Sequence, residues 1–218
     1  MKKGLTELVF ILDRSGSMAG LEEDTIGGFN SMIARQREAD GEALVSTVLF
    51  SFRSQVIHDR VPIRRIPQMT REDFRVGGGT ALIDAIGGAI RHIRNVHKYA
   101  REEDRPEHTV FVIMTDGMEN ASREFSSDDV KAMVKRQQDV CDWEFLFLAA
   151  NIDAVETAAH FGIAPERAVT AHHDARGQAL SFEAADCAIE QVRAARPLGA
   201  GWKHAVEADY AARKRGEK

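Results

Sequence analysis

The pattern that most constrains this chain is a repeated alternation of short apolar runs and segments with helical spacing. The run from Leu8 to Leu12 is apolar without interruption, which is typical of a strand buried on both faces of a parallel sheet. A polar loop follows, and residues 24–37 then place Ile26, Phe29 and Ile33 at helical spacing. Strand, loop and helix in this order form the first half of a βαβ unit.

The same alternation continues along the chain, with one exception. Residues 43–52 and 56–61 both favour strands, and the link between them, Arg53-Ser54-Gln55, is too short for a parallel crossover, so we expect an antiparallel hairpin. The sequence therefore predicts an α/β fold: a doubly wound, mostly parallel sheet with one antiparallel edge strand and helices on both faces. We expect further strands at residues 109–114, 145–149 and 168–170, helices at 82–93, 130–134, 155–161 and 177–195, and a short turn at 70–74.

The length predicts one main domain with a short appendage. At 218 residues the chain is long enough to enclose a single large core. We expect the domain to span residues 1–196 and to end before Pro197 and the Gly199-Ala200-Gly201 break. Residues 197–218 are then a basic C-terminal tail, which we expect to be a solvated helix. Docking of this tail on a partner or on an anionic surface is the alternative.

The composition excludes several classes of protein. With 44% hydrophobic and 29% charged residues, the chain resembles neither a disordered protein nor a membrane protein. The net charge of −5 argues against non-specific binding to nucleic acid, which needs a basic surface. We therefore expect neither nucleic acid nor a membrane as a partner. Trp143 and Trp202 are expected to be packing residues.

The N-terminus and the cysteines favour a cytoplasmic location. Residues 1–4 lead directly into an apolar run that is too short for the hydrophobic region of a signal peptide. Cys141 and Cys187 form no CxxC pattern and lie in segments with apolar patterning. We expect both to be buried, reduced thiols and not a disulfide or a zinc pair.

Side chains with oxygen atoms gather where the predicted strands end. Asp13, Ser15 and Ser17 follow the first strand, Asp116 follows the strand at 109–114, and Thr80 ends a glycine-rich loop that opens a helix. Ligands of such sheets bind beyond the carboxyl ends of the strands, so we expect these two carboxylates and three hydroxyls to converge. Helix capping and turn formation are the alternative for the Asp and Ser residues, although they do not account for the whole set.

Ligands that are all oxygen atoms select a hard cation. Magnesium prefers octahedral geometry with distances of about 2.0 to 2.1 Å and commonly keeps several waters. We therefore expect magnesium, replaceable by manganese or calcium in vitro. Two carboxylates balance the charge of the cation without a surplus, so an open position could accept the carboxylate of a ligand.

Asp13-x-Ser15-x-Ser17 together with Thr80 and Asp116 resembles the metal-ion-dependent adhesion site of von Willebrand factor A (VWA) domains. The resemblance covers residues 5–195, roughly, and implies a Rossmann-like VWA fold whose sheet has one antiparallel strand. By this resemblance, the three hydroxyl residues contact the metal directly or through water. The two aspartates would orient other ligands or bind through water.

Residues near the same strand ends are candidates for a rim that contacts a partner. The segment 116–123 looks like that of a stand-alone bacterial branch of the family. Turn and cap roles are an equal alternative for several of these residues, Ser122 included. We expect His172-His173-Asp174 to be an exposed loop, because nothing nearby supplies the other ligands of a second metal site. The candidate rim consists of Arg14, Gly79, Glu119, Asn120, Asn151 and Asp153.

These features predict a protein-binding module in which an Asp or Glu side chain of a partner protein completes the metal's coordination, without any reaction. The alternatives are a metal-dependent hydrolase, such as a phosphatase, and a scaffold whose metal only stabilises the fold. Asp13 lacks the second acid of a DxD nucleophile motif, and the chain has no GxxxxGK[ST] phosphate loop. Residues 77–79 are a poor match to a dinucleotide-binding GxGxxG motif.

Overall fold

A single six-stranded sheet forms the centre of the molecule, in the strand order β3-β2-β1-β4-β5-β6. The computed structural model describes residues 1–216; residues 217–218 of the predicted tail, including Lys218, lie outside the described residues. The strands are β1 (Lys2–Asp13), β2 (Glu42–Phe50), β3 (Ser54–Pro62), β4 (Pro106–Thr115), β5 (Glu144–Ala150) and β6 (Ala168–Ala171).

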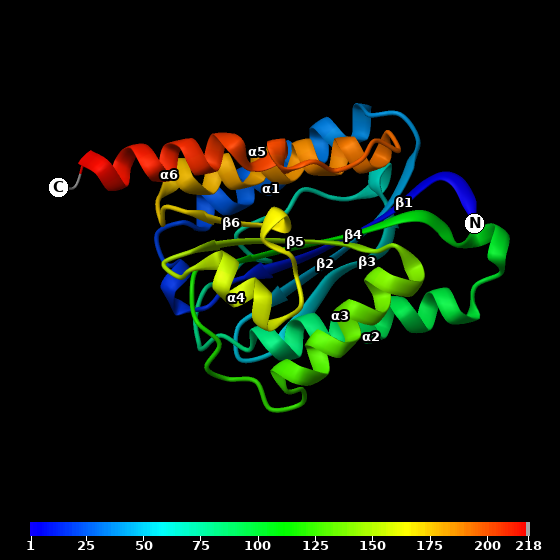
Figure 1. The fold of residues 1–218 in the computed structure, drawn as a ribbon, viewed down its shortest axis with the longest axis horizontal. Coiled ribbons are helices and arrows are strands. Elements are labelled where there is room, and N and C mark those ends of the chain that lie inside the picture. Colours follow the sequence, from blue (N-terminus) through cyan, green and yellow to red (C-terminus); the bar gives the residue numbers. More distant parts are fainter. Residues whose placement is uncertain (217–218) are drawn as a thin grey trace.

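Helices cover both faces of this sheet (Figure 1). One face packs against α1, α5 and α6, and the other against α2, α3 and α4. The structure therefore confirms the predicted doubly wound architecture, with a hydrophobic core on each side of the sheet. The helices are α1 (Glu22–Glu38), α2 (Leu82–Tyr99), α3 (Ser127–Cys141), α4 (Ala154–His160), α5 (Ala175–Arg193) and α6 (His204–Gly216).

The central strand β1 pairs in parallel with β2 on one side and with β4 on the other. Its residues 8–12 are at most 1% exposed, which is why this run is apolar at every position. The edge strand β3 runs antiparallel to β2, so the predicted hairpin is confirmed. Because β1 and β4 are parallel neighbours, the loops that follow them leave the sheet side by side.

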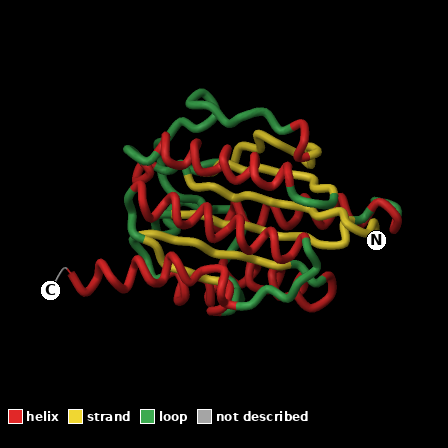
Figure 2. Tube along the Cα trace, turned by 90° about the horizontal axis from the view of Figure 1, so that it is seen from above, coloured by secondary structure: helices red, strands yellow, loops and turns green. Residues whose placement is uncertain are grey.

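The C-terminal helix α6 packs on the domain, contrary to the expectation of a solvated tail. Trp202 is 3% exposed and Val206 is 1% exposed, and both belong to the core under α1 and α5. The Trp202 indole also donates a hydrogen bond to the carbonyl of Glu166 at 3.1 Å. These few apolar contacts are outnumbered in the sequence by basic residues, so composition alone suggested a free helix. Only the C-terminal end of α6 projects beyond the sheet (Figures 1 and 2).

The prediction that the two cysteines are buried is wrong, since both are exposed; both are free thiols. Cys141 is the last residue of α3, and Cys187 lies on the solvent side of α5, whose buried positions include Ala184, Ala185 and Ala188. Trp143 is 5% exposed and stacks on Phe111, so it packs as expected. None of the helices in residues 1–216 is long and apolar enough to cross a membrane.

Candidate metal centre

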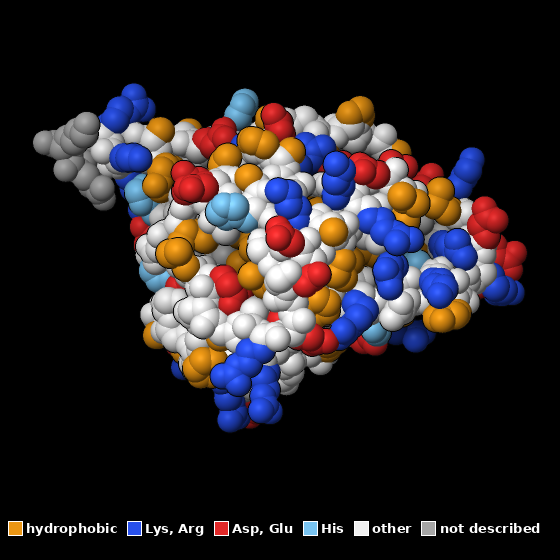
Figure 3. Space-filling view, turned by 60° about the horizontal axis from the view of Figure 1, so that its bottom comes forward, with side chains coloured by type: hydrophobic (Ala, Val, Ile, Leu, Met, Phe, Trp, Pro, Cys, Tyr) orange, Lys and Arg blue, Asp and Glu red, His pale blue; other side chains and the backbone are white. Residues whose placement is uncertain are grey.

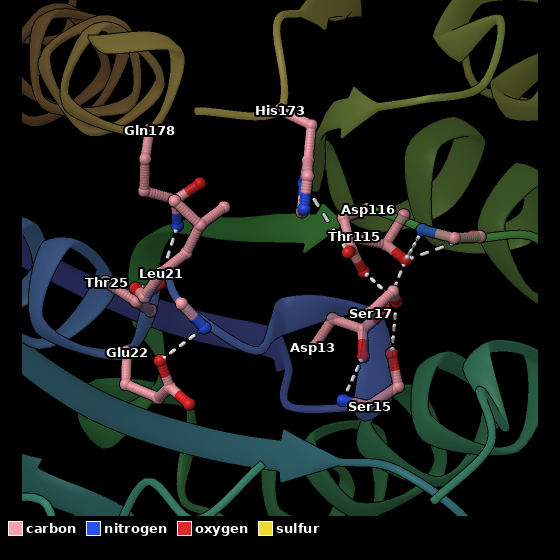
Figure 4. A network of polar contacts seen from close by, with 12 residues as sticks. Asp13, Ser15, Ser17, Leu21, Glu22, Thr25, Thr115, Asp116, His173 and Gln178 are labelled. Carbon is pink, nitrogen blue, oxygen red and sulfur yellow. Dashed lines mark hydrogen bonds and ion pairs between the residues drawn. The ribbon is translucent and has the colours of Figure 1, made fainter. Parts of the chain in front are cut away.

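Four of the five predicted ligands, all except Thr80, meet at the carboxyl ends of β1 and β4 (Figure 4). Asp13 is the last residue of β1, and a short 3-10 turn over residues 16–18 then carries Ser17. Asp116 directly follows β4. These two strands are neighbours at the middle of the sheet, so the loops bring both carboxylates to one place.

A chain of hydrogen bonds links four of the five residues. Asp13 Oδ1 accepts a hydrogen bond from the backbone N–H of Ser15 at 2.7 Å. The hydroxyls of Ser15 and Ser17 share a hydrogen bond at 3.0 Å, and Ser17 Oγ donates to Asp116 Oδ1 at 2.8 Å. The side chains that the sequence places in separate loops are thus in direct contact.

Thr80 is brought to the same place by the glycine-rich loop. Gly77 and Gly78 have positive φ angles of 149° and 85°, which other residues rarely adopt. This backbone lets the loop run against the segment after β1, where Gly16 N donates to Gly78 O at 3.0 Å. A Cβ placed on Gly117 would lie 3.5 Å from both Ser17 Oγ and Thr80 Oγ1, so these two hydroxyls border the same residue.

The centre holds two buried carboxylates, and within residues 1–216 the one ion pair to either is that of His173 Nδ1 with Asp116 Oδ2 at 3.5 Å. Asp13 is 2% exposed and Asp116 is 3% exposed. Burial raises the pKa of Asp13, while hydrogen bonds from Thr115 and Ser15 partly oppose this rise. Asp116 Oδ2 is buried and accepts no hydrogen bond from the residues that the structure describes. Such an arrangement is costly unless a positive charge compensates it.

The donor set fits a divalent cation bound through oxygen atoms. Three hydroxyls and two carboxylates converge, and the unpartnered Asp116 Oδ2 leaves one carboxylate oxygen ready for a ligand role. Residues 1–216 contain no cluster of three or more His, Cys, Asp or Glu side chains that could hold a metal, so any cation here would depend on the hydroxyls. Ser17 is exposed, so the centre opens to solvent at this residue.

Two residues predicted for the rim support the ligand loops. The Asn120 side chain accepts a hydrogen bond from Thr80 N at 2.9 Å, and its backbone N–H donates to Thr80 O at 3.0 Å. Glu119 accepts hydrogen bonds from Ile83 N at 2.9 Å and from Ser122 N and Oγ at 2.7 Å each. Asn120 therefore positions Thr80, and Glu119 ties the loop after β4 to the start of α2.

The remaining rim candidates lie around the centre with varied roles. Arg14 is half-buried and donates to the carbonyl of Asp73 at 3.2 Å; burial lowers its pKa. Asp153 caps α4 by accepting hydrogen bonds from Val155 N and Glu156 N at 3.0 Å each. Asn151 is exposed and has a positive φ of 55°. The turn and cap alternatives thus describe Asp153 and Asn151, and contact with a partner stays a prediction.

Two residues outside the predicted ligand set and rim border the centre. Thr115 ends β4 and donates from Oγ1 to Asp13 Oδ2 at 2.6 Å, which fixes the second oxygen of that carboxylate. His173 points at Asp116, with 3.5 Å between Nδ1 and Oδ2 (Figure 4). This distance is too long for a good hydrogen bond, and the described residues offer His173 Nδ1 no other partner.

The loop 172–174 is half-buried, which corrects the prediction that it is exposed. Helix α6 covers it: the rings of His172 and Tyr210 lie 4.7 Å apart, and Arg213 pairs with Asp174. The packing of α6 on the domain thus explains why this loop is less exposed than predicted.

Phe52 is a further neighbour of the ligand loops. A Cβ placed on Gly78 would lie 2.6 Å from the Phe52 ring, and one on Gly79 would lie 2.7 Å from the ring and from Asn120 Oδ1. The predicted rim residue Gly79 is therefore covered by Phe52 and Asn120. Phe52 itself is 65% exposed, so its outer ring face remains open to solvent.

Comparison with known proteins identifies the fold. No protein-family model and no curated protein matches the sequence. Among solved structures, the manganese-loaded Plasmodium vivax TRAP protein is 16% identical, with a TM-score of 0.59 over 83% of this chain and 73% of that chain. A von Willebrand factor type A structure from Catenulispora acidiphila is 14% identical, with a TM-score of 0.53 over 87% of this chain and 42% of that chain. The chain has a von Willebrand factor A fold.

A third structure with similarity to this VWA fold is proximal thread matrix protein 1 from the mussel byssus, with a zinc-occupied MIDAS motif. It is 12% identical, with a TM-score of 0.58, and the match covers 87% of this chain and 46% of that chain. The chain thus spans less than half the length of the mussel and Catenulispora structures. At these identities the similarity concerns the fold.

Proposed function

We propose that this VWA domain is a metal-ion-dependent protein-binding module whose centre holds a divalent cation, magnesium in the cell, that coordinates an acidic residue of a partner protein. One observation carries the proposal. Two buried carboxylates and three hydroxyls converge at the end of β1 and β4, and a buried oxygen of Asp116 has no hydrogen-bond donor among residues 1–216.

The structural neighbours support the choice of a divalent cation. In the mussel protein zinc occupies the MIDAS motif, and the Plasmodium protein is loaded with manganese. The oxygen donors of this chain favour a harder ion than zinc, which prefers nitrogen and sulfur ligands. Magnesium is therefore our proposal for the cell, with manganese as its laboratory substitute.

Each residue of the centre has a role in this proposal. Ser15, Ser17 and Thr80 supply hydroxyl ligands, and Asp13 and Asp116 balance the charge and orient the hydroxyls or bound waters. When bound, the cation supplies a positive charge and an open coordination position. Ser17 faces solvent, so a carboxylate from another protein can approach at that side.

Capture of partners from a lysate of the source cells, with magnesium or with chelator, tests the proposal. We expect captured proteins in magnesium only, and their loss in Ser17→Ala. Ser31→Ala is the matched control, because it makes the same change at an exposed position of α1. If the same partners bind with chelator and to Ser17→Ala, metal-mediated docking is wrong, and a scaffold with a structural metal becomes the better description.

We also propose that the domain is not an enzyme. The hydrolase alternative would need a base beside the metal, and the candidate is His173, whose Nδ1 lies 3.5 Å from Asp116 Oδ2. A screen with p-nitrophenyl phosphate and p-nitrophenyl acetate, in magnesium and in manganese, should give no turnover above buffer. Metal-dependent turnover that disappears in His173→Ala would instead establish the hydrolase alternative.

A cytoplasmic location belongs to the same proposal. Cys141 and Cys187 are free and exposed, which fits a reducing compartment. Fractionation of the source cells with an antibody to the protein tests this directly. Recovery in a membrane or an extracellular fraction would contradict it.

A further inference from the structure

A groove of about 450 Å³ runs between the β2–β3 hairpin and α2. Phe52 and Val56 form the hairpin side, and Ala85, Gly88 and Ala89 form the helix side. Phe52 is 65% exposed and Val56 is 55% exposed, although both are large apolar side chains. The small side chains of the helix wall leave room in the groove, whose α2 lining also includes Asp84, Arg91, His92 and Ile93.

The groove begins at the candidate metal centre. Ala81 lines it and directly follows the ligand Thr80, and Ala81 N is hydrogen-bonded to Ser51 O at 2.8 Å. Phe52 packs over Gly78 and Gly79 in the same loop. The loop after Asp116 also exposes Met118 to 73%. A ligand bound at the centre thus meets exposed apolar surface immediately beside it.

Most charged side chains along the groove are already engaged within the chain. His92 pairs with Asp59 at 2.8 Å, and Arg91 pairs with Glu124 at 2.6 Å. Asp84 is held by backbone N–H groups of residues 123–125 at 2.8 to 2.9 Å. Among the charged lining residues, Arg53 alone has no side-chain hydrogen bond or ion pair within residues 1–216. The surface that the groove offers a ligand is therefore mainly apolar. In the view of the α2 and α3 side, hydrophobic side chains likewise lie between acidic and basic ones (Figure 3).

We propose that this groove receives a large apolar side chain of the same partner segment whose carboxylate binds at the metal. The partner motif would then be an Asp or Glu with a Leu, Ile or Phe within a few positions. The inference rests on the proposed function and adds a second contact, made by an apolar side chain of the partner, to the contact at the metal. The carboxylate would supply metal dependence, and the apolar side chain would supply specificity, because burying apolar surface is favourable and depends on shape.

Gly88→Phe tests the groove without removing any contact of the fold. A Cβ on Gly88 meets no atom within 4 Å, and replacing a glycine inside a helix favours that helix. The new ring should fill the groove. Gly27→Phe is the matched control, since Gly27 lies in α1 on the opposite face of the sheet and also has no atom within 4 Å of an added Cβ.

The probe is a library of heptapeptides with a fixed central Asp and randomised flanking positions, retained on the wild-type protein in magnesium. We expect selection of Leu, Ile or Phe at one flanking position. A selected peptide should bind at least about tenfold more tightly than its version with Ser at that position, which corresponds to about 1.4 kcal/mol. Gly88→Phe should abolish this advantage and leave the affinity of the Ser peptide unchanged, while Gly27→Phe should keep both.

The outcomes distinguish failure of the groove proposal from failure of the proposed metal-dependent function. Magnesium-dependent retention without an apolar preference, or a preference that survives in Gly88→Phe, would overturn the groove and leave the metal module standing. Equal retention of peptides with central Asp and central Asn, in magnesium and in chelator, would overturn the proposed function and the groove together.

Discussion

Asn120 offers a sharp test of how the metal ligands are positioned. Its side chain accepts a hydrogen bond from Thr80 N at 2.9 Å, and it is exposed on its other side. Asn120→Ala removes this acceptor but keeps the backbone hydrogen bond to Thr80 O. The hydroxyl of Thr80 would then be held less firmly at the centre, although none of the five predicted ligands is altered.

The expected effect on metal affinity is larger than that on stability. Loss of one neutral hydrogen bond typically lowers the free energy of unfolding by about 0.5–1.5 kcal/mol. Removing a side chain that orients a metal ligand typically weakens metal binding by about 10- to 100-fold. Isothermal titration calorimetry with manganese measures the affinity, and urea denaturation with chelator measures the stability.

Asn95→Ala is the matched control, because it makes the same change on the exposed side of α2. We expect wild-type manganese affinity for this control and about 10- to 100-fold weaker binding for Asn120→Ala. Wild-type affinity in Asn120→Ala would refute the reasoning, because Thr80 would then either need no positioning or contribute nothing to the site.

Three further predictions concern charge, loop support and the C-terminal helix. Burial raises the folded-state pKa of Asp13 above its ordinary 3.8. The metal-free protein should therefore lose stability as the pH rises from 3.8 through the folded-state pKa of Asp13. Urea denaturation in chelator measures this loss, which should be absent in Asp13→Asn. Glu119→Ala should lower the free energy of unfolding by about 1.5–3 kcal/mol, since its carboxylate accepts several hydrogen bonds, and an unchanged urea midpoint would contradict the support role. Trp202→Ala should cost about 3–5 kcal/mol in the same assay, whereas a solvated tail would predict almost no change.

Much of the fold could be predicted from local patterns. The run from Leu8 to Leu12 is apolar because β1 lies in the middle of the sheet, and the short link after Phe52 leaves no room for a crossover. The convergence of Asp13 and Asp116 also follows from a general property of parallel sheets, whose loops meet at the carboxyl ends of adjacent strands. These predictions needed only the order of the elements.

What the sequence could not reveal depends on contacts between distant segments. Trp202, just before α6, is buried as predicted, but within α6 the packing depends on Val206, and no periodic pattern distinguishes this helix from a surface helix. The half-buried position of the loop carrying His173 likewise depends on α6, whose Tyr210 and Arg213 contact it. Phe52 gave no signal either, because an aromatic residue at a strand end is ordinarily a core residue.

Crystals of the protein soaked with manganese, with anomalous scattering recorded near the manganese absorption edge, test the central claim most directly. We predict one strong peak at direct or water-mediated ligand distance from the hydroxyls of Ser15, Ser17 and Thr80, and its absence in crystals of Ser17→Ala. A peak elsewhere, or none at this position in the wild type at saturating manganese, would contradict the proposed metal centre.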